Sequence, residues 1–416
     1  MTATLTKQSS PQQLARETFK HEFYVNGVRP VDERLPIPDE LAVELIQKLK
    51  ELNVPKDAFI GVVDAFLILS THLKEAGYTN IMLLERSYRN LIPSQEKYYN
   101  NVKTLCKKSG IKYCVNYEQS DMEFDVIIGN HPYQDGNKDT SYNQLWAEFF
   151  VHSFSMIKPN GVQILIHPVT WATPKDENRK NVTNEVVKIL KDHCIFMNYL
   201  ECGKHFPKVG STFSYTIVTK KKNNGPMNVV TDDDTFTVDS PSVFIDNVLS
   251  KDNNKVAISI VNKIKNYGSR EVITKGKSLV GDLSPTKDED HPYRVQYAAT
   301  TERWSNVIHP LQNVKKVLFA NQSSKNYPVY DDGISAPCNR GAIYPVSSSE
   351  EGNNIVETMK TDVMDFFFSH LRFHHGLLNT NVINLIPDLD YSKVWSNEEL
   401  MIEFGLNEEE INYLNN

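Results

Sequence analysis

Residues 130–133 read Asn-His-Pro-Tyr and directly follow an apolar run, FDVIIG, that predicts a buried strand. The Asn130 side chain and the backbone carbonyl of His131 can both accept hydrogen bonds from a planar exocyclic amine. Pro132 stiffens the turn that aims them, and Tyr133 offers an aromatic face on which a planar base or amide can stack. No carboxylate is needed if the site localises the amine lone pair for attack on a methyl sulfonium. Uncharged residues at a strand end fit such a reaction.

Strands and helices alternate around this motif over the first half of the chain. Largely apolar runs predict strands, at 57–69 (ending near Asp64), 80–85, 111–118, 124–130, 162–168 and 214–220. This alternation predicts a doubly wound, Rossmann-like α/β sheet with helices on both faces. Ligands of such sheets bind at the carboxyl ends of the strands, and Asn130 and Glu85 both fall at such ends.

The order of elements also predicts where the chain divides. A helix is expected to begin just after Pro38, and another over 142–161, ending at Pro-Asn-Gly. After about residue 225 the pattern changes to shorter strands, turns and clusters of Asn, Asp and Gly. We therefore expect three parts, with KKKNNGP as the linker between the last two: a polar N-terminal arm (1–29), a catalytic domain (30–225) and a mixed α+β target-recognition region with an acidic tail (226–416).

The composition is that of an ordinary globular protein. The 416 residues are 40% hydrophobic and 23% charged, and the length predicts two domains. No run approaches twenty apolar residues, and the N-terminus has no apolar signal core, so neither a membrane span nor a secretory signal is expected. The five cysteines are scattered without a Cys-x-x-Cys pair, which favours a reduced, cytoplasmic protein without structural zinc.

Charge is distributed unevenly although the net charge is −7. Residues 251–277 are rich in lysine and arginine, whereas the end of the chain is rich in glutamate. One interpretation is a phosphate-attracting face on a net-acidic protein. The other is a solvated, lysine-rich helix without a nucleic-acid partner. Residues 293–327 mix bases, aromatic rings and amides (Arg294, Tyr297, Arg303, Trp304, Lys315, Lys316, Asn321 and Lys325), as either a DNA-contacting groove or a solvated β-rich domain would.

The motif GNHPYQ resembles the GNPPYQ motif of the adenine-N6 DNA methyltransferases of restriction-modification systems with the gamma order of motifs. In that family the Asn side chain and the next carbonyl hold the amino group of a flipped adenine, and the Tyr stacks on the base. The resemblance implies these roles for Asn130, His131 and Tyr133. Further segments are similar to family motifs in the same order: LPIPDELAVELI, MIKPNGVQILIHPVTW, FPKVGSTFSYTIV and the helix-rich ending PDLDYSKVWSNEELMIEFGLNEEEINYL.

Position 131 departs from the family, which has proline there. The backbone carbonyl survives the change, but the turn loses rigidity and a titratable ring enters near the reacting nitrogen. The alternative is a surface histidine without a role in the chemistry.

The cofactor-binding motif differs from that of the family more than position 131 does. The family binds S-adenosylmethionine with a glycine-rich turn after the first strand, because close backbone approach needs glycine. If the motif begins at Asp57, Gly61 is kept and Val63 replaces the second glycine; if it begins at Asp64, which we prefer, the whole glycine turn is deleted. The resemblance implies a ribose-binding acid at Glu85 and an acid for the cofactor's adenine at Glu118. The implied cofactor set is Pro38, Asp64, Phe66, Glu85 and Glu118.

Other candidates are weaker. His152, His167 and His205 lie in different elements, and we interpret them as structural. His370 and His374 share a helix face at i, i+4 spacing, but no acid completes a metalloprotease motif, so no metal is expected.

Three functions remain open at this point. The first is a DNA adenine-N6 methyltransferase that uses S-adenosylmethionine and double-stranded DNA. The second is a methyltransferase-derived protein that has lost the cofactor turn and acts as a DNA-binding subunit, or as the partner of an active methyltransferase subunit or a cognate restriction endonuclease. The third is a methyltransferase of another planar amine, such as an RNA base or a protein glutamine; the size of the C-terminal region disfavours it.

Overall fold

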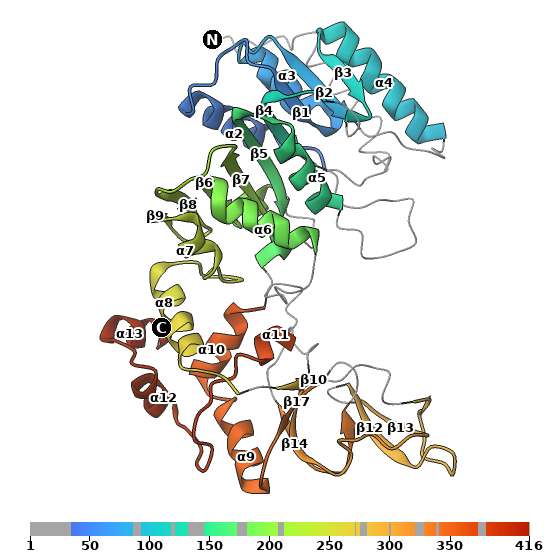
Figure 1. Ribbon diagram of the computed structural model, residues 1–416, viewed down its shortest axis with the longest axis vertical. Coiled ribbons are helices and arrows are strands. Elements are labelled where there is room, and N and C mark those ends of the chain that lie inside the picture. The colour runs from blue at the N-terminus through green and yellow to red at the C-terminus, as the bar shows by residue number, and fades with distance from the viewer. Residues whose placement is uncertain are drawn as a thin grey trace, which may run out of the picture. The chain divides into compact units, whose positions relative to one another are not determined.

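The computed structural model describes residues 35–85, 93–117, 121–131, 145–172, 181–206, 212–270, 272–274, 281–298, 301–320, 328–337, 341–372 and 380–415. The chain divides into two compact units, with the main break between Asp246 and Asn247. Each unit contains its own sheet or sheets (Figure 1), so the two are described separately.

The first unit is built on a nine-stranded sheet in the order β3-β2-β1-β4-β5-β7-β6-β8-β9. The strands are β1 (Ile60–Val63), β2 (Ile81–Glu85), β3 (Lys112–Val115), β4 (Phe124–Asn130), β5 (Ile157–Pro168), β6 (Cys194–Tyr199), β7 (Phe213–Thr219), β8 (Met227–Val230) and β9 (Thr235–Val238). The pairs from β3 to β5 are parallel, and β7 is antiparallel to both of its neighbours. The strand order reverses at β1, where the chain crosses from β3 to β4. The doubly wound sheet predicted from the sequence is therefore confirmed.

Helices cover both faces of this sheet (Figure 1). On one face, α2 (Asp39–Glu51), α3 (Ile68–Glu75) and α4 (Pro93–Ser109) share a single apolar cluster with side chains of β1, β4 and β5. On the other face, α5 (Leu145–Ser155) lies against β5, where the Gln163 side chain donates to the Phe150 carbonyl. Its strand neighbours Ile164 and Ile166 belong to the first cluster, because successive strand residues point to opposite faces. Two further helices, α6 (Val182–His193) and α7 (Pro241–Ile245), complete the second layer.

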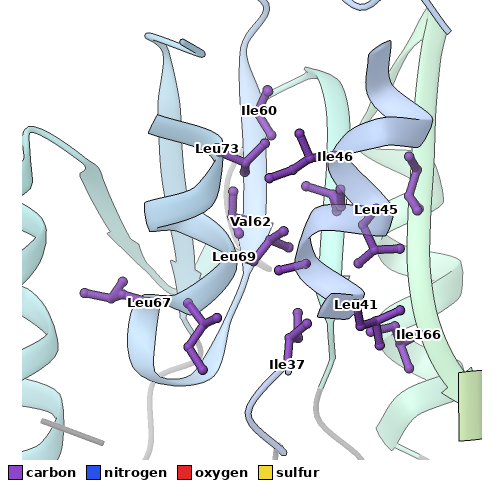
Figure 2. Close-up of a cluster of buried hydrophobic side chains, with 14 of the residues drawn as sticks. Ile37, Leu41, Leu45, Ile46, Ile60, Val62, Leu67, Leu69, Leu73 and Ile166 are labelled. Atoms are coloured by element: carbon purple, nitrogen blue, oxygen red, sulfur yellow. The ribbon is translucent and has the colours of Figure 1, made fainter. Parts of the chain in front are cut away.

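The apolar cluster fixes the position of α2 over the strands. Leu41, Leu45 and Leu49 recur at helical spacing and are fully buried. Figure 2 shows side chains of α2 and α3 meeting over β1, with Ile166 of β5 at the edge of the cluster. Burial of each such side chain contributes about 1.5–3 kcal/mol, so α2 and the segment before it are held firmly against the ends of the strands.

The first sheet continues past residue 225, where the sequence led us to expect a domain boundary. β8 pairs in parallel with β6, and β9 pairs with β8, so the unit extends to Asp246. The polar run 220–226, expected to be a linker, is the connection between β7 and β8. The Asn223 side chain donates to the Cys194 carbonyl at 2.6 Å, which ties this connection to the sheet.

The end of α5 also differs from expectation. The helix expected over 142–161 ends at Ser155 in the structure, and β5 begins at Ile157. Pairing with β4 shifts register between Phe124 and Val126, so that the intervening Pro-Asn-Gly is accommodated in an irregular stretch of the strand. Lys158 in this stretch pairs with Asp125 of β4 at 2.8 Å. Strand pairing therefore outweighs the Pro-Asn-Gly signal for a helix end.

The second unit is mixed α+β, as expected. One four-stranded sheet has the order β10-β17-β14-β15 and the other β11-β13-β12-β16. The strands are β10 (Ile273–Thr274), β11 (Leu283–Ser284), β12 (Tyr293–Ala298), β13 (Thr301–Ser305), β14 (Lys315–Ala320), β15 (Val329–Asp332), β16 (Ala336–Pro337) and β17 (Gly341–Pro345). The helices are α8 (Lys255–Asn266), α9 (Ser349–Thr358), α10 (Asp362–His370), α11 (Thr380–Ile383), α12 (Asn397–Glu403) and α13 (Glu408–Leu414).

The basic stretch and the acidic tail pair with each other in this unit. Lys263 of α8 binds Glu410 of α13 at 2.7 Å, and the Glu410 side chain is only 4% exposed. Arg270 pairs with Glu351 and Asp388. Lys275 and Lys277 lie outside the described residues. The interpretation of 251–277 as a phosphate-attracting face is therefore wrong for Lys263 and Arg270, since carboxylates of this chain already neutralise them.

Candidate functional site

Gly129 brings the ends of β4 and β1 unusually close together. Its φ is +148°, and a Cβ built at this position would lie 1.9 Å from the Val63 carbonyl oxygen. Val63 is also the residue paired with Gly129 across the two strands. No side chain fits at position 129, so glycine is required there. The close approach places Asn130, the next residue, level with the residue that follows β1.

Asn130 is fully buried at the carboxyl end of β4. Its Nδ2 atom donates to the Leu35 carbonyl at 2.9 Å. Leu35 lies just before Pro38, the residue that precedes the first turn of α2. Because the amide nitrogen is held by a backbone oxygen, the plane of the carboxamide is fixed, and its Oδ1 atom is the acceptor that an exocyclic amine requires.

His131 is not a surface residue. Its side chain is fully buried, and its ring stacks on Trp146 with centroids 6.3 Å apart and planes 21° apart. The Phe149 ring lies 5.6 Å away on the same helix, α5. The ring is therefore packed against α5, whereas the Asn130 amide contacts the segment before α2. Pro132 and Tyr133 lie outside the described residues.

The stack continues to His167 of β5. Its ring lies 6.0 Å from the Trp146 ring with planes 18° apart. One ring nitrogen contacts the Thr216 hydroxyl at 3.1 Å and the other the Pro168 carbonyl at 3.2 Å. Complete burial lowers the pKa of His167 from 6.5 to about 4, so the ring is neutral at physiological pH. His167 is a structural histidine, as the sequence led us to expect.

The two acids of the expected cofactor site meet at the ends of adjacent strands. Asp64 follows β1 and Glu85 ends β2; these strands pair in parallel, and both side chains are buried. The negative charges of Glu85 and Asp64, added to burial, raise the pKa of Cys106 in α4 to about 12, so all three groups lie near one another. The Asp64 Oδ2 atom also accepts the Ser70 amide hydrogen at 2.8 Å, which anchors the start of α3. Glu118 lies outside the described residues.

The turn after β1 has a left-handed backbone without glycine. Phe66 has φ 65° and Leu67 has φ 59°, a region that costs a non-glycine residue about 1–2 kcal/mol. The Phe66 side chain is fully buried, its ring lies edge-on to Tyr98 at 5.4 Å, and its amide nitrogen is 3.4 Å from the Tyr98 hydroxyl. Gly61 lies inside β1, not in a turn. The structure thus places Asp64 directly after the strand, as our preferred alignment requires.

These residues match an S-adenosylmethionine site only in part. Buried carboxylates at the ends of β1 and β2 suit hydroxyl and amino groups of such a cofactor. The turn does not suit its methionine portion, because it has no glycine, its Phe66 ring is buried against Tyr98, and the Phe66 amide also faces Tyr98. We therefore derive no step of the reaction from contacts between the cofactor and this turn.

Sequence reasoning missed two residues of the site, Leu35 and Trp146. Leu35 contributes only a backbone carbonyl, for which no sequence signal exists. Trp146 belongs to the apolar run LWAEFF, in which Trp146, Phe149 and Phe150 lie at i, i+3 and i+4. That spacing predicts a buried helix face, and the position of α5 directly after the motif was a usable signal that this face lies beside it.

The second unit presents a polar face on the sheet of β12 and β13. Arg294 is paired with Trp304 across the strands, and Gln296 with Glu302, so the four side chains share one face. Lys287 lies 5.3 Å above the Trp304 ring, and Arg294 pairs with Glu302.

Other residues of the expected DNA-contacting segment are placed differently. Lys316 is fully buried and binds Asp331 at 2.7 Å, so its expected role in DNA contact is wrong. Lys315 lies 3.7 Å from Asp332. Asn321 and Lys325 lie outside the described residues.

Two further expectations concern metals and membranes. Within the described ranges, no three His, Cys, Asp or Glu side chains gather in a metal-binding arrangement, and no helix there is long and apolar enough to cross a bilayer. His370 is buried and binds Asp252 at 2.9 Å. His374 lies outside the described residues.

Comparison with known proteins gives a family match within the first unit. The sequence model of the Eco57I restriction-modification methylases matches residues 39–196. No curated protein sequence matches the chain. The structure is similar to a protein from Listeria monocytogenes described as a class I S-adenosylmethionine-dependent methyltransferase, with 14% identity and a TM-score of 0.40 over 55% of this chain and 74% of that one.

Two restriction-modification proteins are also similar in structure. The type IIG restriction endonuclease BpuSI has 11% identity and a TM-score of 0.42, over 91% of this chain and 61% of its own. The M protein of the type I restriction enzyme EcoKI has 14% identity and a TM-score of 0.34, over 47% of each chain. The fold assignment rests on the sheet topology described above, not on these likenesses.

Proposed function

We propose that the chain is a site-specific DNA methyltransferase, on the premise that residues 39–196, which match the sequence model of the Eco57I restriction-modification methylases, form a methylase domain. Its substrate would be an adenine flipped out of double-stranded DNA, with methylation at N6. The observation that carries this proposal is the fixed amide of Asn130 at the end of β4, beside the two buried acids Asp64 and Glu85.

Asn130 would act on the amino group of the adenine. Its Oδ1 atom and the His131 carbonyl would accept the two amine hydrogens, which draws the nitrogen lone pair out of conjugation with the ring. S-adenosylmethionine, when bound, would supply the electrophilic methyl group and leave as S-adenosylhomocysteine, and the excess amine proton would pass to solvent. The hydrogen bond from Asn130 to Leu35 supports this role, because it fixes the orientation of the amide.

Contact with DNA would come from the second unit. The shared face of Gln296 and Trp304, with Lys287 above the Trp304 ring, offers a cation, an amide group and an aromatic surface together. Arg294 on the same face is paired with Glu302. Phosphates attract the cations, and base edges bind amide and guanidinium groups. The basic stretch of α8 is a poorer candidate, since Lys263 is paired with Glu410.

Binding of S-adenosylmethionine is expected to be weak. The left-handed turn at Phe66 and Leu67 has no glycine, so a Cβ stands at each position where close backbone approach to the cofactor would need none. We expect a dissociation constant near about 1 mM instead of about 1 μM, a difference of about 4 kcal/mol.

The same observation favours a second candidate function. If this turn excludes the cofactor altogether, the chain is a methyltransferase-like, DNA-binding subunit that assembles with an active methyltransferase or a restriction endonuclease. In that case Asn130 would hold a base without modifying it.

One experiment separates the two functions. The affinity of the isolated chain for S-adenosylmethionine is measured by calorimetry. Its transfer of a labelled methyl group to unmethylated genomic DNA is then measured, and N6-methyladenine is mapped in the product. Weak binding with slow, site-specific labelling supports the methyltransferase. Absence of both, with retained duplex binding, supports the partner subunit. Labelling of RNA or protein but not of DNA contradicts the choice of substrate.

A further inference from the structure

We propose that His131 is a positioning residue whose ring, held between α5 and the strand ends, fixes the carbonyl that receives the substrate amine. The inference rests on the proposed function, since it concerns the same carbonyl. A family member with proline at this position has a backbone held by the pyrrolidine ring. This chain lacks that ring, and the stack of His131, Trp146 and His167 provides a different restraint.

The restraint begins at the His131 ring itself. The ring is fully buried, stacks on Trp146 and contacts the Phe149 ring at 5.6 Å. A side chain enclosed on this scale has one accessible rotamer, and the Cα to which it is attached cannot rotate without displacing the rings. The carbonyl of His131 is bonded to the same Cα, so the position of the axis about which it can turn is restricted as well.

The far side of the stack is anchored to the sheet. Trp146 lies between His131 and His167, and His167 is held by Thr216 of β7 and by the Pro168 carbonyl. The Phe150 ring closes one edge of His167 at 5.4 Å. The restraint on His131 therefore extends from β4 through α5 to β5 and β7, and does not depend on the helix alone.

Asn130 and His131 are consequently held from opposite faces of the sheet. Asn130 binds Leu35 on the α2 side, and His131 packs on the α5 side. Two adjacent acceptors are thus oriented by separate contacts, so that loss of one contact should disturb one acceptor only.

The test is a double-mutant cycle on His131→Ala and Trp146→Leu, with methyl transfer as the readout. Each single change should lower kcat by about tenfold to a hundredfold with little change in KM for DNA, because a misplaced acceptor acts after binding. The double variant should be no slower than the slower single variant. His131→Pro should recover most of the rate, since proline restrains the same backbone. Phe154→Leu is the matched control: Phe154 is on α5 but contacts His193 instead, and its change should leave kcat unaltered.

Hydrogen exchange provides a second measurement that needs no activity. Trp146→Leu should increase amide exchange in residues 124–131 at least tenfold, and Phe154→Leu should not. Unchanged exchange in Trp146→Leu would overturn the inference, as would additive losses in the cycle without rescue by His131→Pro. If the native chain transfers no methyl group at all, the proposed function fails, and the exchange measurement still decides whether the stack restrains the turn.

Discussion

The ends of β4 and β1 lie side by side in the sheet, but glycine is present at the first and absent from the turn that follows the second. At the end of β4, glycine occupies the position where a Cβ would collide with the neighbouring strand, and Asn130 is fixed by one hydrogen bond. At the end of β1, the backbone turns through left-handed conformations at Phe66 and Leu67, where glycine is absent. The end of β4, the proposed substrate side, has Gly129 and Asn130 in a fixed geometry but histidine at position 131, whereas the turn after β1, the proposed cofactor side, has no glycine.

This difference separates two uses of glycine. Gly129 is needed for packing between two strands of the same chain, so its loss would distort the fold itself. A glycine in the β1 turn would serve close approach by a ligand, and the fold can do without it when Phe66 and Leu67 bury their side chains in the core. A cofactor site can therefore lose its fit while the sheet around it remains intact.

The largest expected effect concerns the substrate side. Asn130→Ala should reduce methyl transfer by about 100- to 1,000-fold, because an acceptor aimed at the reacting amine is lost. Binding to duplex DNA should change little, since phosphate contacts dominate affinity. Rate and affinity are measured by methyl labelling and by titration of labelled duplex.

Asn130→Asp is the matched control for that change. It keeps an acceptor but removes the N–H that binds Leu35, so it should also be slow. A fast Asn130→Asp variant would show that the contact with Leu35 does not orient the amide. A Tyr133→Ala variant is expected to lose base modification in the same way, with duplex binding retained.

The next effect concerns the stack behind His131. The pKa of His167 is lowered by burial to about 4 from its ordinary 6.5. Between these values the unfolded chain binds more protons than the folded chain, so the free energy of unfolding falls as pH falls. The loss should be about 2 kcal/mol between about pH 7 and about pH 5. Urea unfolding at both values would measure it, and His167→Gln should remove this component; an unaltered pH dependence in that variant would contradict the assignment.

A smaller effect is expected on the cofactor side. Phe66→Gly should tighten binding of S-adenosylmethionine by about tenfold, or about 1.4 kcal/mol, because glycine adopts the left-handed turn without a side chain in the way. The variant should be less stable, since a buried ring is lost. Tyr98→Phe keeps both rings but frees the Phe66 amide, and should give a lesser gain. Calorimetry on folded variants decides; unchanged affinity in Phe66→Gly would show that the ring is not the obstacle.

The smallest effect lies away from both strand ends. Lys287→Ala and Trp304→Ala should weaken duplex binding modestly, and Lys287→Ala should reduce the salt dependence by about one counterion without altering affinity for S-adenosylmethionine. Lys263→Met should instead lower the stability of the second unit, because Glu410 is left buried without its partner. Equal salt slopes for the native chain and Lys287→Ala would exclude this face as a phosphate contact.

The sequence alone predicted the position of Asn130 at the end of β4, but it predicted the turn after β1 only in part. In the run FDVIIGN the apolar strand residues are followed at once by Asn130, so the local sequence was enough to predict that Asn130 ends a strand. The loss of glycine after β1 was also visible. The left-handed backbone at Phe66 and Leu67 was not, because both residue types disfavour it and only tertiary packing imposes it.

Contacts between distant segments account for the remaining misses. The burial of His131 depends on Trp146 of α5, and the orientation of Asn130 depends on a carbonyl before α2. The basic and acidic stretches were noticed separately, yet nothing in either one specifies that Lys263 and Glu410 should pair. Past residue 225 the weak strand pattern concealed two further strands of the first sheet.

The pairing of Lys263 with Glu410 also bears on the timing of folding during synthesis. The two residues are separated by 147 positions, so α8 leaves the ribosome long before its partner helix has been translated. Until then the basic face of α8 remains uncovered in the nascent chain, and the second unit cannot complete its packing. The first unit also contains contacts between distant residues, such as the hydrogen bond from Tyr215 to Glu44, which are 171 positions apart. Packing of α8 against α13 therefore waits until residue 410 has been translated.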